Sequence, residues 1–328
     1  MEVRSTLAMN TLLSSRMTAT QGQIQRIEQQ VASGKKADTF AQLGTEAGID
    51  IALHNEANSI ATYQVNNKII AGRLSAMDQS MIAIHDVTES VKSDAYALMP
   101  SDAQRGALID KATAAFNTVV NALQVSVGGR SLFSGEKTDT LPVDPDVMTT
   151  LKANIALLPN PLDATAVEAE ISNFFSTTGN FYQGGSLTTA TAIDQNLSID
   201  YNIVASDPAF RTTLQGLATI ALAPKPDGTN TTDAQYATVV ANTASLLSAG
   251  VGGVNALISS NGNNQALVET TNTQHEATLT LVGTQINTLE ETDMTTAATQ
   301  LALLRTQLEA TYAMTSQINE LSLVNYLK

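Results

Sequence analysis

Hydrophobic residues recur at alternating steps of three and four along residues 53–98. Only Glu56, Asn67 and Thr88 in this seam are clearly polar. The seam consists of Leu53, Glu56, Ile60, Tyr63, Asn67, Ile70, Leu74, Met77, Met81, Ile84, Thr88, Val91, Ala95 and Leu98. Such spacing predicts a helix whose apolar stripe packs along a partner helix. At about 1.5 Å per residue, this helix would be roughly 70 Å long.

A second seam with the same spacing runs along residues 240–289 and predicts a rod of about 75 Å. Its polar position His275 is expected to set the register of packing rather than to bind a ligand. Because neither rod can bury its stripe alone, we expect the two to form a long antiparallel helical bundle. Its expected core consists of Ile60, Ile70, Leu74, Met77, Met81, Leu247, Val254, Ile258, Val268 and Leu279.

A further helix is expected to open after Pro100, with Ser101 or Asp102 as its N-cap. Its stripe would be Ile109, Ala112, Phe116, Val119, Leu123 and Val127. We expect this helix to stop at Gly128 and Gly129, because glycine commonly follows the last turn of a helix. Together with Leu132 and Phe133, the two glycines would mark the boundary with the next part of the chain.

The heptad pattern is absent between residues 132 and 233, where seven of the eight prolines also lie. Alternation along residues 197–203 predicts a half-buried strand. Residues 165–175 and 208–222 have the pattern of short amphipathic helices. We therefore expect a mixed α/β module inserted in a mostly α chain, with residues 132–233 as a distal, β-containing central domain.

The two ends of the chain carry weaker seams, separated from the rods by breaks at residues 33–47 and 290–296. The N-terminal seam is Leu13, Met17, Thr20, Ile24, Ile27 and Val31, and the C-terminal seam is Leu301, Leu304, Leu308, Met314, Ile318 and Leu321. Matching breaks suggest a nested architecture. A terminal coiled-coil pair would comprise residues 1–45 and 290–328, and the rod domain residues 46–131 and 234–289.

The last residues are apolar nearly all round, so one partner helix cannot cover them. An ordinary buried helix of the same chain is the alternative, but we favour burial against other subunits, with termini largely disordered until subunits pack. The expected assembly interface is Leu13, Met17, Ile24, Ile27, Leu301, Leu304, Leu308, Ile318, Leu321, Leu323 and Leu327.

Composition removes several classes of function. The net charge of −14 argues against a nucleic-acid partner, since phosphate binding depends on Lys and Arg. With no cysteine, disulfides and thiol chemistry are excluded. No stretch approaches the length of a membrane span, and the N-terminus lacks the apolar core of a signal peptide. We expect no membrane insertion, and either a cytoplasmic protein or export by a route without such a signal.

No residue pattern marks an enzyme. Residues 128–138, GGRSLFSGEKT, resemble a phosphate-binding loop but have Arg130 where the motif needs glycine and Glu136 where it needs lysine. None of the three histidines has a second histidine four residues on, so no helical zinc pair exists. We expect no catalytic residue, no cofactor and no metal.

Several short segments resemble the flagellin superfamily. Residues 27–36, IEQQVASGKK, resemble its Q-x-x-S-G-K-R turn. Three further segments resemble the hook-associated, FlgL-type branch of the superfamily, at the hook–filament junction. SLFSGEKTDT at 131–140 is similar to its Y-L-F-S-G-T-K-T-D motif. LEATY at 308–312 is similar to its L-x-A-S-Y motif, and LSLVNYL at 321–327 to its L-S-L-L-N-Y-L motif. Residues 201–211, YNIVASDPAFR, resemble its A-x-D-P-x-F-R run. Residues 38–45, DTFAQLGT, replace the family's P-S-D-D-P segment, so contacts made by that loop are not carried over.

The resemblance implies a non-enzymatic structural subunit that serves motility. Such a subunit is exported unfolded through the flagellar type III channel, with an export chaperone, to the extracellular flagellum. There it self-associates in a ring between the proximal hook-associated junction protein and the flagellin filament. Two alternatives remain: a filament flagellin, and a helical stalk whose central domain binds or cleaves glycans, although the few aromatics, 4%, weigh against sugar stacking.

Overall fold

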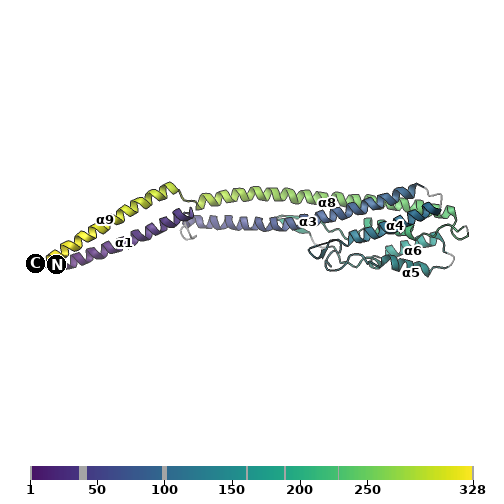
Figure 1. The fold of residues 1–328 in the computed structure, drawn as a ribbon, viewed down its shortest axis with the longest axis horizontal. Helices are drawn as coiled ribbons and strands as arrows, with labels where there is room; N and C mark the ends of the chain where they lie inside the picture. The colour runs from purple at the N-terminus through teal and green to yellow at the C-terminus, as the bar shows by residue number, and fades with distance from the viewer. Residues whose placement is uncertain are drawn as a thin grey trace. The chain divides into compact units, whose positions relative to one another are not determined.

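The computed structural model describes residues 2–36, 43–97, 102–159, 162–187, 190–227 and 229–326, and side chains at most of them. Helices dominate this part of the chain, with only short strands between them, as expected for a mainly α fold (Figure 1). The chain divides into two compact units. Unit 1 comprises residues 1–61 and 275–328, and unit 2 comprises residues 62–274. The finer division into terminal, rod and central domains stays a prediction.

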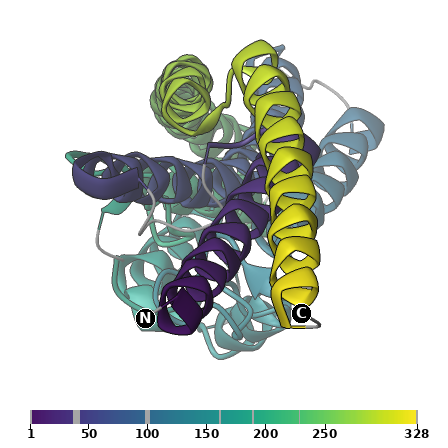
Figure 2. The same cartoon turned by 90° about the vertical axis from the view of Figure 1, so that its left-hand side faces the viewer.

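Unit 1 contains the two terminal helices, α1 (Glu2–Ser33) and α9 (Met294–Tyr326). They lie side by side and run in opposite directions, with both chain ends at the same end of the pair (Figures 1 and 2). The unit also holds the 3-10 turn η1 (Gly44–Glu46), the first residues of α3 (Ala47–Tyr96) and the last residues of α8 (Asp233–Glu290). The two predicted breaks are therefore real helix ends.

Unit 2 is built along the parts of α3 and α8 that lie within residues 62–274; the two helices are 50 and 58 residues long in all. Side-chain amides join them within this unit. Asn261 Nδ2 and Gln265 Nε2 donate to the Leu74 carbonyl over 2.9 and 3.3 Å. Asn67 Nδ2 donates to Asn272 Oδ1 over 3.1 Å. These contacts set the antiparallel register of the two helices.

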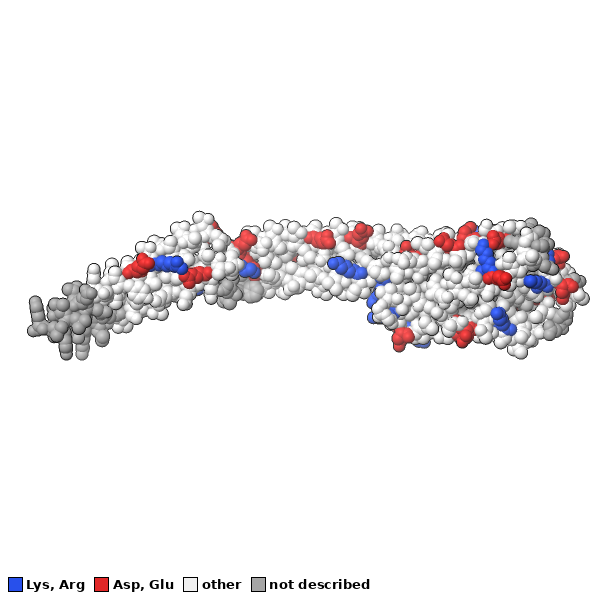
Figure 3. Space-filling model, viewed as in Figure 1, with Lys and Arg blue, Asp and Glu red and all other residues white. Residues whose placement is uncertain are grey.

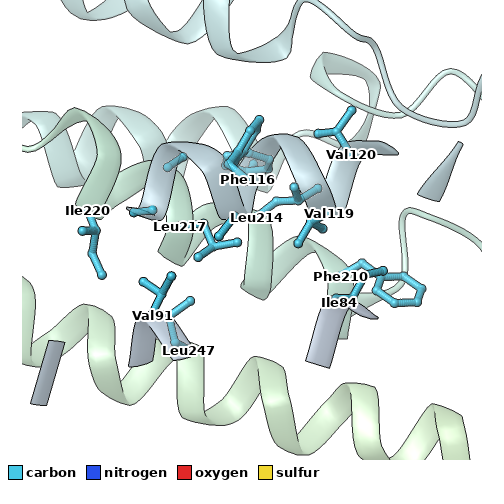
Figure 4. Close-up of a cluster of buried hydrophobic side chains, with 14 of the residues drawn as sticks. Ile84, Val91, Phe116, Val119, Val120, Phe210, Leu214, Leu217, Ile220 and Leu247 are labelled. Atoms are coloured by element: carbon cyan, nitrogen blue, oxygen red, sulfur yellow. The ribbon is translucent and has the colours of Figure 1, made fainter. Parts of the chain in front are cut away.

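The main core of unit 2 lies between α3, α8 and two helices that cover them, α4 (Asp102–Leu123) and α7 (Pro208–Leu222). Figure 4 shows Phe116 and Val119 of α4 converging with Leu214 and Leu217 of α7. Two residues fix the start of α7: Pro208 occupies its first turn, and Asp207 caps it by accepting a hydrogen bond at Oδ1 from the Ala209 amide over 2.8 Å.

Three further elements complete the central part of unit 2. Helix α6 (Ala164–Ser176) and helix α7 match the two amphipathic helices that the sequence predicts. Helix α5 (Val147–Ala156) and the turn η2 (Thr178–Asn180) were not predicted. The buried stripe of α5 has only three members, Val147, Leu151 and Ile155, which is too short a repeat to stand out between prolines.

Two small hairpins supply the strands. Strand β3 (Thr191–Asp194) pairs antiparallel with β4 (Leu197–Ile199), so the predicted strand over 197–203 ends four residues early. Strand β1 (Ser126–Val127) pairs with β2 (Arg130–Ser131). Gly128 and Gly129 form the turn between β1 and β2, with φ of 62° and 75°.

The prediction that Gly128 and Gly129 stop a helix is therefore wrong. Helix α4 already ends at Leu123, and the buried residue of its first turns is Leu108 rather than Ile109. A two-residue loop with positive φ at both positions is the type I′ turn that joins tightly twisted strands, and glycine adopts it without strain.

One expectation about membrane spans needs correction. Helix α8 contains an 18-residue window with mean hydropathy 1.3, which by length and composition alone could cross a membrane. The other residues of the protein bury 44% of that window. A core helix of a soluble protein passes the same test, so this is weak support for a span.

Candidate functional site

The facing seams of α1 and α9 form the candidate assembly surface, and they are incompletely buried. Ile24 is the buried member among the predicted interface residues whose side chains are described. The others are half-buried: Leu13, Met17, Ile27, Leu301, Leu304, Leu308 and Ile318. Leu321, Leu323 and Leu327 lie outside the residues whose side chains the structure describes. A pair of helices thus leaves much of its own seam in contact with solvent.

One seam position was misassigned. Met314 is 59% exposed, whereas Thr311 and Thr315 occupy the half-buried positions of α9. Steps of three and four from Leu308 lead to Thr311, Thr315 and Ile318, so the heptad rule holds without a slip. The sequence interpretation preferred the more hydrophobic methionine over the correct spacing.

Polar contacts flank the seam and hold the two helices in register. Arg305 Nη2 lies 2.7 Å from Glu28 Oε1, and Gln21 Nε2 donates to the Tyr312 hydroxyl over 2.8 Å. Both contacts are exposed, and surface ion pairs contribute only about 0–1 kcal/mol. They orient the helices more than they stabilise them.

A second apolar stripe lies on α9 away from the seam. Leu303, Ala310 and Met314 are exposed and follow one another at steps of seven and four, so they share one face of the helix. At 100° per residue this face lies about 110° from the seam. Leu303 is 67% exposed. The described surface of the terminal pair is mostly uncharged (Figure 3).

A groove of about 390 Å³ follows the pair beside this stripe. It is lined by Gln23, Arg26, Ile27, Gln30, Gln300, Leu303 and Leu304. Amide, aliphatic and guanidinium side chains from both helices thus form this groove.

The helix breaks of unit 1 meet in a joint that polar groups hold together. The backbones of Lys35 and Glu291 pair as an isolated antiparallel β-bridge. The Thr292 amide donates to the Gly34 carbonyl over 3.0 Å, and the Lys36 amide donates to the Glu290 carbonyl. Asp293 directly precedes α9, and its Oδ1 accepts from the Thr295 amide over 2.9 Å. Hydrogen bonds from Thr296 and Thr295 hold the pKa of Asp293 below its usual range.

Four ionisable side chains cluster in the joint. Lys35 Nζ lies 2.5 Å from Glu290 Oε2, and His54 Nε2 lies 3.0 Å from Glu290 Oε1 and 3.8 Å from Asp50 Oδ1. The hydrogen bond with Glu290 raises the pKa of Lys35. Hydrogen bonds from Lys35 and then His54 lower the pKa of Glu290. This cluster was not predicted from the sequence, because its signal there is an aspartate four residues before a histidine and not a pair of histidines.

The predicted rod-core positions are distributed as follows. Ile258 and Leu279 are half-buried. The remaining eight are buried: Ile60, Ile70, Leu74, Met77, Met81, Leu247, Val254 and Val268. At the predicted boundary, Gly128 and Gly129 are exposed and Leu132 is half-buried. Phe133 is buried against Phe210, with ring centroids 5.7 Å apart in an edge-to-face arrangement.

The GGRSLFSGEKT segment also lines a pocket of about 440 Å³ in unit 2. Arg130, Ser131, Gly135 and Thr138 contribute to it from the segment, and Arg73 from α3. The segment does not have the structure of a phosphate-binding loop, in which a helix follows the lysine directly. Arg130 lies in strand β2 of a hairpin, and no helix follows Lys137 directly.

Comparison with known proteins gives a family match and matches to solved structures. The family described as "Bacterial flagellin C-terminal helical region" matches residues 244–327. A flagellar hook-associated protein from Vibrio parahaemolyticus has a TM-score of 0.54 and 14% identity, over 74% of this chain and 97% of that chain. FlgL from Bacillus cereus has a TM-score of 0.44 and 12% identity, over 74% of this chain and 99% of that one. A search of curated proteins finds no match.

The family match covers α8 from residue 244 onward and the whole of α9, which are the elements that carry the second rod and the C-terminal seam. The Vibrio protein supports the fold independently, because the match spans nearly its whole length. The chain therefore carries the bacterial flagellin C-terminal helical region at residues 244–327, and it shares its fold with the Vibrio flagellar hook-associated protein.

Proposed function

We propose that the protein is a structural subunit of the hook–filament junction. It is exported unfolded by the flagellar type III route, with a chaperone, and self-associates in a ring through α1 and α9. Its neighbours are the proximal hook-associated junction protein on one side and the flagellin filament on the other. The observation that supports this proposal is the incomplete burial of apolar side chains on α1 and α9.

Burial is the physical reason. Leu303 and Met314 are 67% and 59% exposed on α9, and Leu12 is exposed on α1. Each apolar side chain removed from water contributes about 1.5–3 kcal/mol when it becomes fully buried. Contiguous exposed apolar surface on a soluble protein commonly marks an interaction site. Packing of terminal pairs from neighbouring subunits would cover the stripe, the groove and the half-buried seam together.

Removal of residues 301–328 tests the role of the pair. The truncated protein should retain the helical circular dichroism expected for unit 2, because the core of that unit contains no residue beyond 274. It should not enter the flagellum, and cells that carry it should lack attached filaments. Normal filaments on such cells would contradict the proposal.

A point substitution separates assembly from folding more sharply. Leu303→Glu should leave the monomer folded, since the side chain is already exposed, and should reduce incorporation by at least about tenfold through the cost of burying a charge. Leu157→Glu is the matched control, because Leu157 is 85% exposed in unit 2 and lies outside the terminal pair. Equal incorporation of both variants would show that the α9 stripe is not an interface.

A filament flagellin is the second candidate, and the match to the flagellin C-terminal helical region is compatible with it as well. The two roles differ in copy number and in self-assembly. Purified monomer of a junction subunit should form at most short rings or oligomers, whereas a flagellin should elongate into filaments. Electron microscopy of seeded and unseeded samples distinguishes the two.

A glycan-binding role for the central part has less support. Every phenylalanine between residues 132 and 233 is buried, so none of them offers an exposed stacking surface: Phe133, Phe174, Phe175, Phe181 and Phe210. Sugar recognition usually relies on exposed aromatic faces.

A further inference from the structure

The joint of unit 1 contains a carboxylate that is buried without a hydrogen bond from any described residue. The Asp50 side chain is 0% exposed, and neither of its oxygens has a hydrogen-bond partner among the described residues. Burial of an ionised carboxylate costs several kcal/mol unless it is paired and hydrogen-bonded. The nearest cationic or titratable nitrogen recorded is His54 Nε2, which at 3.8 Å is too far for a hydrogen bond.

The neighbours of Asp50 have the composition and spacing of a metal site. Asp50 and His54 are four residues apart on α3, so their side chains project from one face of the helix. Glu290 reaches the same point from the end of α8. One ligand atom from each of the three residues lies within 4.8 Å of the others.

These separations suit a tetrahedral ion. Zinc binds nitrogen and carboxylate oxygen at about 2.0–2.2 Å, so two ligand atoms of a tetrahedral site lie about 3.4 Å apart. His54 Nε2 lies 3.0 Å from Glu290 Oε1 and 3.8 Å from Asp50 Oδ1, which brackets that value. The third pair, Asp50 and Glu290, has its ligand atoms within 4.8 Å of each other.

We propose that Asp50, His54 and Glu290 bind a divalent transition-metal ion of the zinc class. Asp50 and Glu290 would each supply one oxygen and His54 would supply Nε2, which leaves the fourth position open to water. A nitrogen ligand with two carboxylates favours zinc over Mg²⁺ or Ca²⁺, which prefer oxygen ligands alone. The proposal does not depend on the junction role.

Lys35 fits as an outer partner of this site. It contacts Glu290 Oε2 and leaves Oε1 directed at His54. Groups that hold the second oxygen of a metal-binding carboxylate orient it toward the ion. With Lys35 protonated and His54 as a neutral ligand, the two carboxylates leave the cluster with a net charge of −1, which attracts a cation. Bound metal would fasten the start of α3 to the end of α8, next to the break that precedes α9.

Zinc titration of the full-length chain, stripped with a chelator beforehand, tests the site. Isothermal titration calorimetry should show one Zn²⁺ per chain, and Asp50→Asn or His54→Gln should weaken binding by more than about tenfold. His85→Gln is the matched control, because His85 lies on the same helix and pairs with exposed Asp86 at 3.0 Å without a third ligand. It should bind Zn²⁺ as the unaltered chain does.

A second measurement guards against misfolded variants. Because Asp50→Asn removes a buried charge, the metal-free variant should be at least as stable as the metal-free parent in thermal unfolding followed by circular dichroism. Added Zn²⁺ should raise the Tm of the parent and not that of the variant. If the parent neither binds Zn²⁺ nor shifts its Tm, the cluster is an ion-pair network only and the proposal is overturned. The proposal also fails if Asp50→Asn and His54→Gln bind Zn²⁺ as tightly as His85→Gln does.

Discussion

Single asparagines decide how the two long helices of unit 2 meet. Asn67 and Asn261 are buried at seam positions, where most of the other residues are apolar. Each donates its amide to a carbonyl, Asn67 to Ile193 over 2.9 Å and Asn261 to Leu74 over 2.9 Å. A polar residue at such a position penalises every register in which its partner is absent. They therefore favour a single alignment of the two helices.

Replacement of Asn67 by leucine should destabilise unit 2. The leucine fits the volume, but the Ile193 carbonyl loses the donor that reaches it from α3. Loss of a buried hydrogen-bond partner costs about 1–3 kcal/mol. Urea unfolding followed by circular dichroism measures the change.

The control for this substitution is Asn66→Leu, at the adjacent and exposed position. It should stay within about 0.5 kcal/mol of the parent. If both variants unfold alike, the amide of Asn67 contributes no more than a surface residue does.

At this scale the sequence could locate polar seam positions but not their partners. The Ile193 carbonyl belongs to a hairpin whose place beside α3 depends on the tertiary fold. Gly128 and Gly129 illustrate the same limit. Two glycines fit both a helix end and a hairpin turn, and the choice depends on the pairing of Val127 with Arg130. The Asp50–His54 spacing was visible in the sequence, whereas Glu290 could be added only from the structure.

Whole elements followed from the sequence where their repeats were long. The heptads of α3 and α8 extend over many turns, so chance could not produce them, and the breaks before and after the terminal helices fall at the predicted places. Short elements in the central part gave weaker signals, as the missed α5 shows. Leu98, the last predicted residue of the first seam, lies outside the described residues.

Glycines on α8 set how closely α7 approaches it. A Cβ atom at Gly253 would lie 2.7 Å from Ala209 Cβ and 3.2 Å from Ala209 Cα, whereas one at Gly252 would meet nothing within 4 Å. Gly253→Ala should therefore push α7 outward and cost about 1–3 kcal/mol. Gly252→Ala should instead stabilise by about 0.5–1 kcal/mol, because alanine restricts the unfolded chain.

The two adjacent substitutions share one chemistry and one helix, so their difference isolates the contact with α7. Chemical unfolding of both variants and the parent gives the comparison. Two stabilised variants would mean that α7 does not pack on Gly253 in solution.

Across the whole molecule, the two units differ in what stabilises them. Unit 2 has a large apolar core in which α4 and α7 bury most of their inward faces. The α1–α9 pair of unit 1 has a single seam that is mostly half-buried. Isolated helices gain little stability from propensity alone, so their persistence depends on packing. The terminal pair is therefore the part of the chain that gains most from a neighbouring subunit.

Hydrogen exchange can measure this difference directly. In the monomer, amides of α1 and α9 should exchange at least about a hundredfold faster than those of α4 and α7, because local opening of a half-buried pair costs little. On assembly, the amides of α1 and α9 should become strongly protected, while those of α4 and α7, already protected, serve as the internal control. Protection of α1 in the monomer equal to that of α7 would mean that the seam suffices by itself, and the exposed stripe of α9 would then need another explanation than subunit packing.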